Sequence, residues 1–442
     1  MSVILIGFVV LLLLIIVVRM PIAFAMGLVG FFGFAVMMGL SWDNWDTFRW
    51  TGPMSMAANR VVSTVQNYSL SVIPLFILMG NLVMRSGLSQ ELYQASNAFL
   101  GHKKGGLAMA TVVACGGFSA ISGSSLATSA TMSKVAMPSM RKYGYSDSLA
   151  TATIAAGGSL GILIPPSVIL VVYGLLTETS IRELFAAGFI PGFIAILFYL
   201  GAVQYVVWRN PSAGPAGDRT PWRERLIALR GVLGVLALFV IVMGGIYLGI
   251  FTPTEAAGIG AGGAFVIALM RKSLTWSSLF DTLTDTARTS VMLLVVVIGA
   301  LIFSDFINRA GLPDILLSFV NSLDVQPIVV ILVIVGIYLI LGMVFESLSM
   351  MLLTIPIFYP LVAALGYDLV WFGIVVVIAI EISLITPPVG MNVFVLSAVL
   401  RDVKTSTIFK GVGPFWVADI LRLLLIIFVV QISLFLPTLL YR

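Results

Sequence analysis

Charged residues are scarce in this chain. Only 10% of its 442 residues are charged, whereas 60% are hydrophobic. A soluble domain carries about 25% charged residues, which keep its surface in water. The scarcity excludes a water-soluble enzyme, a disordered regulator and a free nucleic-acid-binding protein, and it predicts a polytopic membrane protein in contact with lipid.

Cysteine and histidine are almost absent, since Cys115 and His102 are the only examples. One cysteine excludes a disulfide framework. One histidine, next to Lys103 and Lys104, argues against a histidine-ligated metal site and a histidine general base. The sequence also lacks a G-x-x-x-x-G-K-[ST] phosphate loop, so this polypeptide has no ATP site of that kind to drive a pump.

Long apolar runs are the dominant feature. The first run, "SVILIGFVVLLLLIIVV", follows no basic residues and precedes no small-residue cleavage site, so we interpret it as a retained span. A span needs about 20 apolar residues. On this basis we predict ten crossings, at 2–18, 22–40, 68–84, 148–176, 188–208, 231–250, 254–270, 290–307, 369–400 and 412–436.

Two further apolar stretches, 106–136 and 328–364, are interrupted by Gly, Ser or Glu. Irregular backbone at membrane depth is tolerated only where protein or water covers it, so we predict two re-entrant helical hairpins. With the N-terminus outside, most Lys and Arg lie on the inner side, as the positive-inside rule requires. The same layout makes the first hairpin enter from the cytoplasm and the second from the outside.

The chain contains an internal repeat, which predicts two halves, 1–208 and 231–442, joined by a cytoplasmic linker at 209–230. Each half holds five crossings and one hairpin, and an odd number of crossings inverts the second half relative to the first. Inverted repeats are typical of secondary transporters. At a spacing of 222 residues, Pro138, Gly144, Tyr145, Pro165 and Pro166 recur as Pro360, Gly366, Tyr367, Pro387 and Pro388. At a spacing of 223, Gly188 and Pro191 recur as Gly411 and Pro414.

Both halves have a Pro-Pro pair inside a predicted span, in "GGSLGILIPPS" at 157–167 and "LITPPVGMNVF" at 384–394. Proline removes a backbone donor and leaves carbonyls without intrahelical partners, and such oxygens suit a small hard cation such as sodium. The N-termini of the half-helices favour a carboxylate. The pattern predicts two broken helices, with two cation sites around one anion site.

Each feature also has a purely structural interpretation. Small-residue runs such as 119–130 often form helix-packing faces, and a Pro-Pro pair can be a simple kink. Their joint occurrence at matching positions in both halves favours the functional interpretation. Glu346 and Glu381 near membrane depth are either functional groups or helix-end groups that face water. The segment 41–50 is either an interfacial aromatic belt, which we favour, or a contact for a partner.

At these motifs the chain resembles the large membrane subunit of tripartite ATP-independent periplasmic (TRAP) transporters. The resemblance rests on "GGFSAISGSSLAT", "GILIPPS", "FTPTEAAG" at 251–258 and "TPPVGMNVFV" at 386–395, and it covers essentially the whole chain. It implies an all-α, inverted-repeat, elevator-type fold and sodium-coupled uptake of an organic acid, such as a C4-dicarboxylate, across the bacterial inner membrane. It also implies a separate small four-helix membrane subunit and a periplasmic substrate-binding protein.

The resemblance places sodium ligation, largely by main-chain oxygens, at one set of residues in each half. We predict the substrate contacts from their position near the hairpin tips. The first sodium set is Ser119, Ser122, Gly161, Ile164 and Pro166, the second is Gly342, Ser383, Thr386 and Val389, and the predicted substrate contacts are Ser124, Ser125, Thr128, Ser347 and Asn392.

Two rival functions remain from the sequence. A stand-alone sodium–carboxylate symporter or anion exchanger would need no binding protein. An intramembrane serine protease is suggested by "GGSLG" at 157–161, which fits G-x-S-x-G. A nucleophile elbow needs a strand–turn–helix and a nearby base, whereas His102 lies among lysines, so we do not expect an enzyme.

Overall fold

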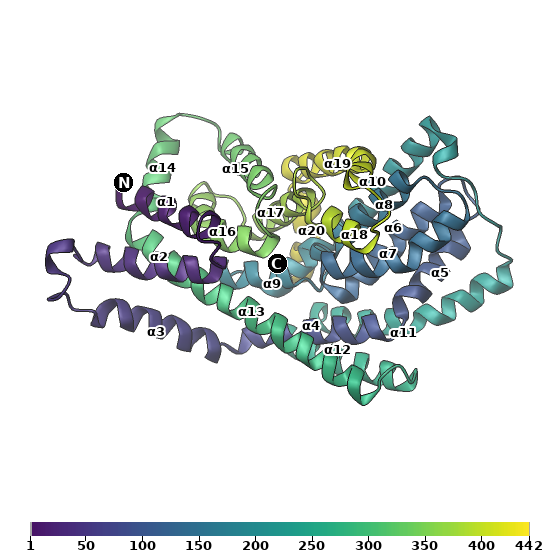
Figure 1. Cartoon of the computed structure of the whole chain (residues 1–442), viewed down its shortest axis with the longest axis horizontal. Helices are drawn as coiled ribbons and strands as arrows, with labels where there is room; N and C mark the ends of the chain where they lie inside the picture. The colour runs from purple at the N-terminus through teal and green to yellow at the C-terminus, as the bar shows by residue number, and fades with distance from the viewer. Residues whose placement is uncertain (1, 442) are drawn as a thin grey trace.

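A computed structural model describes residues 2–441 (Figure 1), and every regular element in this range is a helix. The all-α fold class is therefore confirmed. Seven helical stretches within the described range are long and apolar enough to cross a membrane. They are Tyr68–Arg85, Ile181–Arg209, Trp222–Tyr247, Pro253–Met270, Trp276–Arg309, Ser347–Ala364 and Thr405–Phe428.

The described part of the first half contains ten α-helices. Among them α3 and α5 were not expected, because their polar residues keep them below the hydropathy of a span. Their bounds are α1 (Ser2–Ile16), α2 (Ile22–Met37), α3 (Thr51–Gln66), α4 (Val72–Arg85), α5 (Leu88–Leu100), α6 (Gly106–Ser122), α7 (Ser125–Lys142), α8 (Asp147–Ser159), α9 (Val168–Thr177) and α10 (Ile181–Arg209).

Up to Tyr441, the last residue that the structure describes, the second half also contains ten α-helices, of which α14 was not expected. The linker between α10 and α11 is shorter than the predicted range 209–230, because the polar residues from Trp222 onward already form the first turns of α11. The bounds are α11 (Trp222–Tyr247), α12 (Pro253–Met270), α13 (Trp276–Arg309), α14 (Leu312–Ser322), α15 (Pro327–Leu341), α16 (Ser347–Ala364), α17 (Leu369–Ser383), α18 (Met391–Val399), α19 (Thr405–Phe428) and α20 (Gln431–Tyr441).

The helix order from α5 to α9 recurs from α14 to α18. Gly87 before α5 and Gly311 before α14 both adopt positive φ, 78° and 72°. The left-handed region favours glycine, so the matching sequences "RSGL" at 85–88 and "RAGL" at 309–312 specify the same turn. Each Pro-Pro pair contains a cis peptide bond and separates two helices, α8 from α9 and α17 from α18. The backbone therefore repeats at the positions that the sequence repeat indicated.

Two of the predictions for the apolar segments need adjustment, whereas the two broken helices agree with the structure. The spans at 148–176 and 369–400 are each two helices, as broken helices require. The span at 412–436 is not continuous, because α19 ends at Phe428 and α20 begins at Gln431. The helix α16, which we assigned to a hairpin, is itself long and apolar enough for a span.

The longest helix, α13, packs along α2 and α4, and α4 packs along α12. In Figure 1, α3, α13, α12 and α11 follow the lower side of the molecule, and the hairpin helices and the broken helices lie above them. Helix α8 of the first half packs on α19 of the second, and α7 packs on α18. The two broken regions thus lie in one body, in which α9 contacts α4 and the hairpin helix α16 contacts α13.

Candidate functional site

The first hairpin turns at a glycine that no other residue could replace without strain. Helix α6 ends at Ser122, Gly123 follows with φ +60°, and Ser124 caps α7 by accepting a hydrogen bond from the Ala127 amide at 3.3 Å. A Cβ on Gly123 would lie 3.0 Å from the carbonyl oxygen of Pro166. The hairpin tip therefore lies directly against the first Pro-Pro break.

The first break itself has tight internal contacts. After α8 a 3-10 turn covers Leu160–Ile162, and a Cβ on Gly161 would lie 2.8 Å from the Ser124 carbonyl. Ser167 caps α9, accepting from the Leu170 amide at 3.3 Å and donating to the Ile162 carbonyl at 2.5 Å. Small residues and a hydroxyl cap thus bring the tip and the break into contact.

The second half repeats this arrangement with different residues. Helix α15 ends at Leu341, and the carboxylate of Glu346 caps α16 by accepting from the Ser349 amide at 3.0 Å. A Cβ on Gly342 would lie 2.2 Å from the Cβ of Ser383, so glycine is required for this close approach. The second hairpin therefore packs against the end of α17, next to the second break.

The two hairpin tips share a cavity of about 200 Å³. The first turns of four helices line it, because Ser125, Val168, Ser347 and Met391 begin α7, α9, α16 and α18. Helix N-termini carry partial positive charge, so this convergence favours an anion. The side facing α4 and α13 is formed by Ile77, Thr289, Met292 and Leu293, and the remaining lining residues are Gly123, Ser124, Leu126, Ile162, Ile169, Glu346, Leu348 and Leu384.

Three of the five predicted substrate contacts line this cavity: Ser124, Ser125 and Ser347. The other two do not. The Thr128 hydroxyl lies 2.9 Å from the Ser122 hydroxyl and donates to the Ser124 carbonyl at 2.8 Å, so it holds the tip together.

The Asn392 side chain does not line the cavity either, and its amide nitrogen donates to the Ala155 carbonyl at 3.0 Å. This bond joins α18 to α8. The direction of a side chain on a helix depends on the rotation of that helix within the fold, which sequence position alone does not reveal.

The first predicted sodium set gathers around the hairpin tip. Ser119 is fully buried, and its hydroxyl has no hydrogen-bond partner among the described residues. A Cβ on Gly80 of α4 would lie 2.9 Å from the Ser122 carbonyl. Together with the close approach of Gly161 and Pro166 to the tip, these contacts place buried hydroxyl and carbonyl oxygens in one region, which suits a hard cation. Ile164 lies in the same break and is buried.

The second predicted sodium set is also a local group. Gly342 approaches Ser383, whose hydroxyl donates to the Ile380 carbonyl at 2.7 Å. The Thr386 hydroxyl donates to the Ile382 carbonyl at 2.6 Å and accepts from the Trp416 indole at 3.1 Å. Val389 follows the second Pro-Pro pair and is half-buried. The oxygen donors of the second set resemble those of the first set.

The two acidic residues that the sequence singled out have different surroundings. Glu346 lines the cavity, where it is the only charged residue among the lining residues described. Glu381 is fully buried in the last turn of α17 and accepts from Arg422 at 2.6 Å. Arg422 lies within the predicted span 412–436, and the sequence did not indicate its pairing with Glu381.

Broken helices around a cavity, in a multi-pass helical protein, are typical of membrane transport proteins. Residues 8–432 match the family described as "Tripartite ATP-independent periplasmic transporter, DctM component". This chain belongs to that family, the large permease subunits of TRAP transporters. It is a multi-pass protein of the inner membrane and a transporter subunit, and not an enzyme.

The names of curated relatives specify different substrates. The C4-dicarboxylate permease DctM of Pseudomonas aeruginosa is 37% identical over 381 residues, covering 86% of this chain and 88% of the relative. The sialic acid permease SiaM of Vibrio cholerae is 32% identical over 388 residues, covering 87% and 90%. The ectoine permease TeaC of Halomonas elongata is 33% identical over 393 residues, covering 88% and 91%.

Solved structures with the same fold are more distant in sequence. The Alcanivorax borkumensis YdaH transporter aligns with a TM-score of 0.64 at 16% identity, covering 86% of this chain and 89% of that chain. The Neisseria gonorrhoeae MtrF pump aligns with a TM-score of 0.60 at 14% identity, covering 87% and 85%. At these identities the likeness concerns the fold alone.

Proposed function

We propose that this chain imports an organic acid anion together with sodium, after a periplasmic binding protein delivers the acid and while a small membrane subunit is bound. The observation that carries the proposal is the convergence of four helix N-termini, two from each half, on one cavity. The described lining contains no Lys, Arg or His. Binding of a carboxylate would therefore depend on helix N-termini and on the hydroxyls of Ser124, Ser125 and Ser347.

Sodium is the proposed driving ion. The hydroxyl of Ser119 and the carbonyls around Gly161 and Pro166 supply hard oxygen donors in the first half. Gly342, Ser383 and Thr386 supply a comparable group in the second half. Sodium binding at both groups would add positive charge on two sides of the anion cavity and so favour the substrate.

The proposed movement is that of an elevator. The cavity has hairpin tips and broken helices on one side and α4 and α13 on the other. Because these two sides come from different groups of helices, sliding the hairpins and broken helices along α13 would carry the substrate across the membrane. A double variant, Ala127→Cys with Thr289→Cys in a Cys115→Ala background, tests this, since both positions line a second cavity of about 210 Å³ at the same boundary.

A thiol cross-linker between these two positions is expected to stop uptake, and cleavage of the linker is expected to restore it. Each single-cysteine variant treated with the same reagent is the control. Full uptake by the cross-linked protein would contradict the elevator movement.

The experiment for the function itself is uptake of radiolabelled organic acids into proteoliposomes with an inward sodium gradient. The chain is tested alone, with its small subunit, and with the binding protein added. We expect uptake only with sodium and all three components. Sodium-driven uptake by the chain alone would instead favour the stand-alone symporter.

The cavity serines are tested in the same assay. Ser125→Ala and Ser347→Ala are expected to raise the KM for the substrate, because each removes a hydroxyl from the cavity. Ser322→Ala is the matched control, because Ser322 is an exposed serine on α14, outside the cavity lining. An unchanged KM in both cavity variants would remove these hydroxyls from the substrate site.

A further inference from the structure

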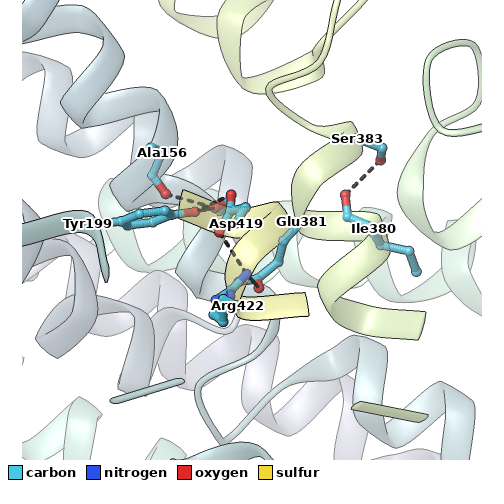
Figure 2. A network of polar contacts seen from close by, with 8 residues as sticks. Ala156, Tyr199, Ile380, Glu381, Ser383, Asp419 and Arg422 are labelled. Atoms are coloured by element: carbon cyan, nitrogen blue, oxygen red, sulfur yellow. Dashed lines mark hydrogen bonds and ion pairs between the residues drawn. The ribbon is translucent and has the colours of Figure 1, made fainter. Parts of the chain in front are cut away.

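A chain of buried polar contacts runs from the first break to the second (Figure 2). The hydroxyls of Ser159 and Tyr199 lie 3.1 Å apart, and the Tyr199 hydroxyl donates to Asp419 at 2.7 Å. One nitrogen of Arg422, Nη2, lies 2.9 Å from Asp419 Oδ1 and donates to Glu381 Oε2 at 2.6 Å. All five side chains are fully buried.

The ends of this chain lie beside the two proposed sodium groups. Ser159 is the last residue of α8, two positions before Gly161. Glu381 is in the last turn of α17, two positions before Ser383. Between them, Tyr199 is on α10, and Asp419 and Arg422 are on α19. The contacts therefore connect the helix that precedes the first break with the helix that precedes the second.

The hydrogen-bonding capacity of Arg422 is only partly used. Nη2 donates a hydrogen bond to Glu381 and makes only an ion-pair contact with Asp419 Oδ1. Asp419 Oδ1 and the other two nitrogens of Arg422, Nε and Nη1, have no hydrogen-bond partner among the described residues. The second oxygen of Glu381, Oε1, also has no partner there. Buried donors and acceptors are normally all paired, because an unpaired one is costly. Spare donors on the guanidinium and a spare carboxylate oxygen allow a second pairing, in which Glu381 and Asp419 each receive their own nitrogen.

We propose that Tyr199 and Arg422 are positioning residues that couple the two sodium groups, so that binding at one increases the affinity of the other. The inference rests on the sodium-coupled function proposed above. Sodium bound to carbonyls around Gly161 moves the end of α8 and with it Ser159. The Tyr199–Asp419–Arg422 contacts transmit that displacement to Glu381 and the end of α17, and Arg422 changes from the shared to the separate pairing.

A purely structural role for the same contacts makes a different prediction. If the residues only hold four helices together, their loss would reduce the amount or the thermal stability of the protein. It would leave the sodium dependence of the remaining uptake unchanged. The shape of the sodium curve therefore separates coupling from helix packing, since coupling is defined by the effect of one bound ligand on another.

The first test is Tyr199→Phe, which removes the hydroxyl that joins Ser159 to Asp419. Phenylalanine retains the ring that packs on Phe415, and Ser159 retains its bond to the Ala156 carbonyl at 2.7 Å. We expect the Hill coefficient for sodium in proteoliposome uptake to fall toward 1 and half-saturation to need at least about fivefold more sodium. The matched control is Tyr145→Phe, a buried tyrosine whose hydroxyl accepts from the Leu107 amide outside this network.

A wild-type sodium curve in Tyr199→Phe would overturn the inference. So would an equal change in Tyr145→Phe, because the effect would then follow from the loss of any buried tyrosine hydroxyl. Uptake by the wild type that does not depend on sodium would instead refute the proposed function. The two failures are thus distinguishable in one assay.

The second test replaces the whole ionic group, Glu381→Met with Asp419→Leu and Arg422→Met. Replacing a complete buried ion group by apolar residues commonly preserves a fold, whereas removing one partner leaves a buried charge unpaired. We expect the triple variant to insert, to melt near the wild-type temperature and to show a Hill coefficient near 1. A wild-type coefficient in the triple variant would show that the contacts serve packing alone.

Discussion

The two Pro-Pro breaks have the same backbone plan but differ in exposure. Every residue from Gly161 to Leu170 is buried, including Pro165 and Pro166. In the second half, Pro387 and Pro388 are exposed and Val389 is half-buried. The first copy of the Pro-Pro motif is thus enclosed by protein, whereas the second copy lies at the surface.

The hairpin tips differ in a second way, which concerns their caps. Ser124 caps α7 with a neutral hydroxyl, whereas Glu346 caps α16 with a carboxylate. Both residues line the cavity. The first half therefore presents a hydroxyl to the cavity, and the second half places one acidic side chain beside the four helix N-termini. Equivalent positions in a repeat can retain a structural role, here capping, while they diverge in charge.

The largest effect is expected from closing the glycine contacts at the tips. Gly342→Ala would place a Cβ 2.2 Å from that of Ser383, and Gly123→Ala would combine a positive φ with a 3.0 Å contact to Pro166. Crowding of this kind costs about 1–3 kcal/mol at the site. We expect sodium-driven uptake, normalised to protein in the membrane, to fall more than about tenfold in both variants.

Gly336→Ala is the control for these variants, because no atom lies within 4 Å of a Cβ at that position of α15. Uptake by Gly342→Ala at the level of this control would show that the second tip tolerates displacement. The proposed equivalence of the two tips would then be wrong.

An intermediate effect is expected from the two caps. Ser124→Ala removes the hydroxyl that accepts the Ala127 amide, which costs about 1 kcal/mol, so we expect uptake to fall about fivefold. Glu346→Gln keeps an acceptor for the Ser349 amide but removes the negative charge from the cavity. It is therefore expected to lower the KM of a dianionic acid more than that of a monoanionic one.

These cap predictions are checked by measuring KM for a matched dicarboxylate and monocarboxylate in proteoliposomes. An equal change for both acids in Glu346→Gln would mean that its carboxylate does not face the substrate.

The smallest effect on uptake, but the most direct view of the asymmetry, is expected from cysteine labelling in a Cys115→Ala background. Ile164→Cys lies in the buried break and Val389→Cys in the half-buried one. A membrane-impermeant thiol reagent is expected to label Val389→Cys faster, and sodium is expected to slow that labelling. Equal labelling rates would show that the two breaks do not differ in access.

The helix breaks and the hairpin turns could be predicted from the sequence because their causes are local. Proline removes a backbone donor, and glycine is the residue that most easily adopts a left-handed conformation, as it does at Gly123 and Gly311. Both residue types can be read from the sequence. The helices α3, α5 and α14 were missed because a hydropathy scan detects only segments apolar enough to span.

The remaining parts of the site depend on tertiary packing. Ser124, Ser125 and Ser347 could be placed in the cavity because each begins a helix at a hairpin tip. Thr128 and Asn392 could not, since their direction follows from how α7 and α18 are rotated. The pairing of Glu381 with Arg422 joins residues 41 positions apart on different helices, and only the packing of α17 on α19 brings them together.

We propose that one anion travels with cations held at two groups, one in each half. The most direct test is the number of sodium ions transported per substrate molecule, measured from parallel initial rates of labelled sodium and labelled acid in proteoliposomes that contain all three components. We expect a ratio of two or more sodium ions per substrate molecule. A ratio of one, or substrate uptake without any sodium flux, would contradict it.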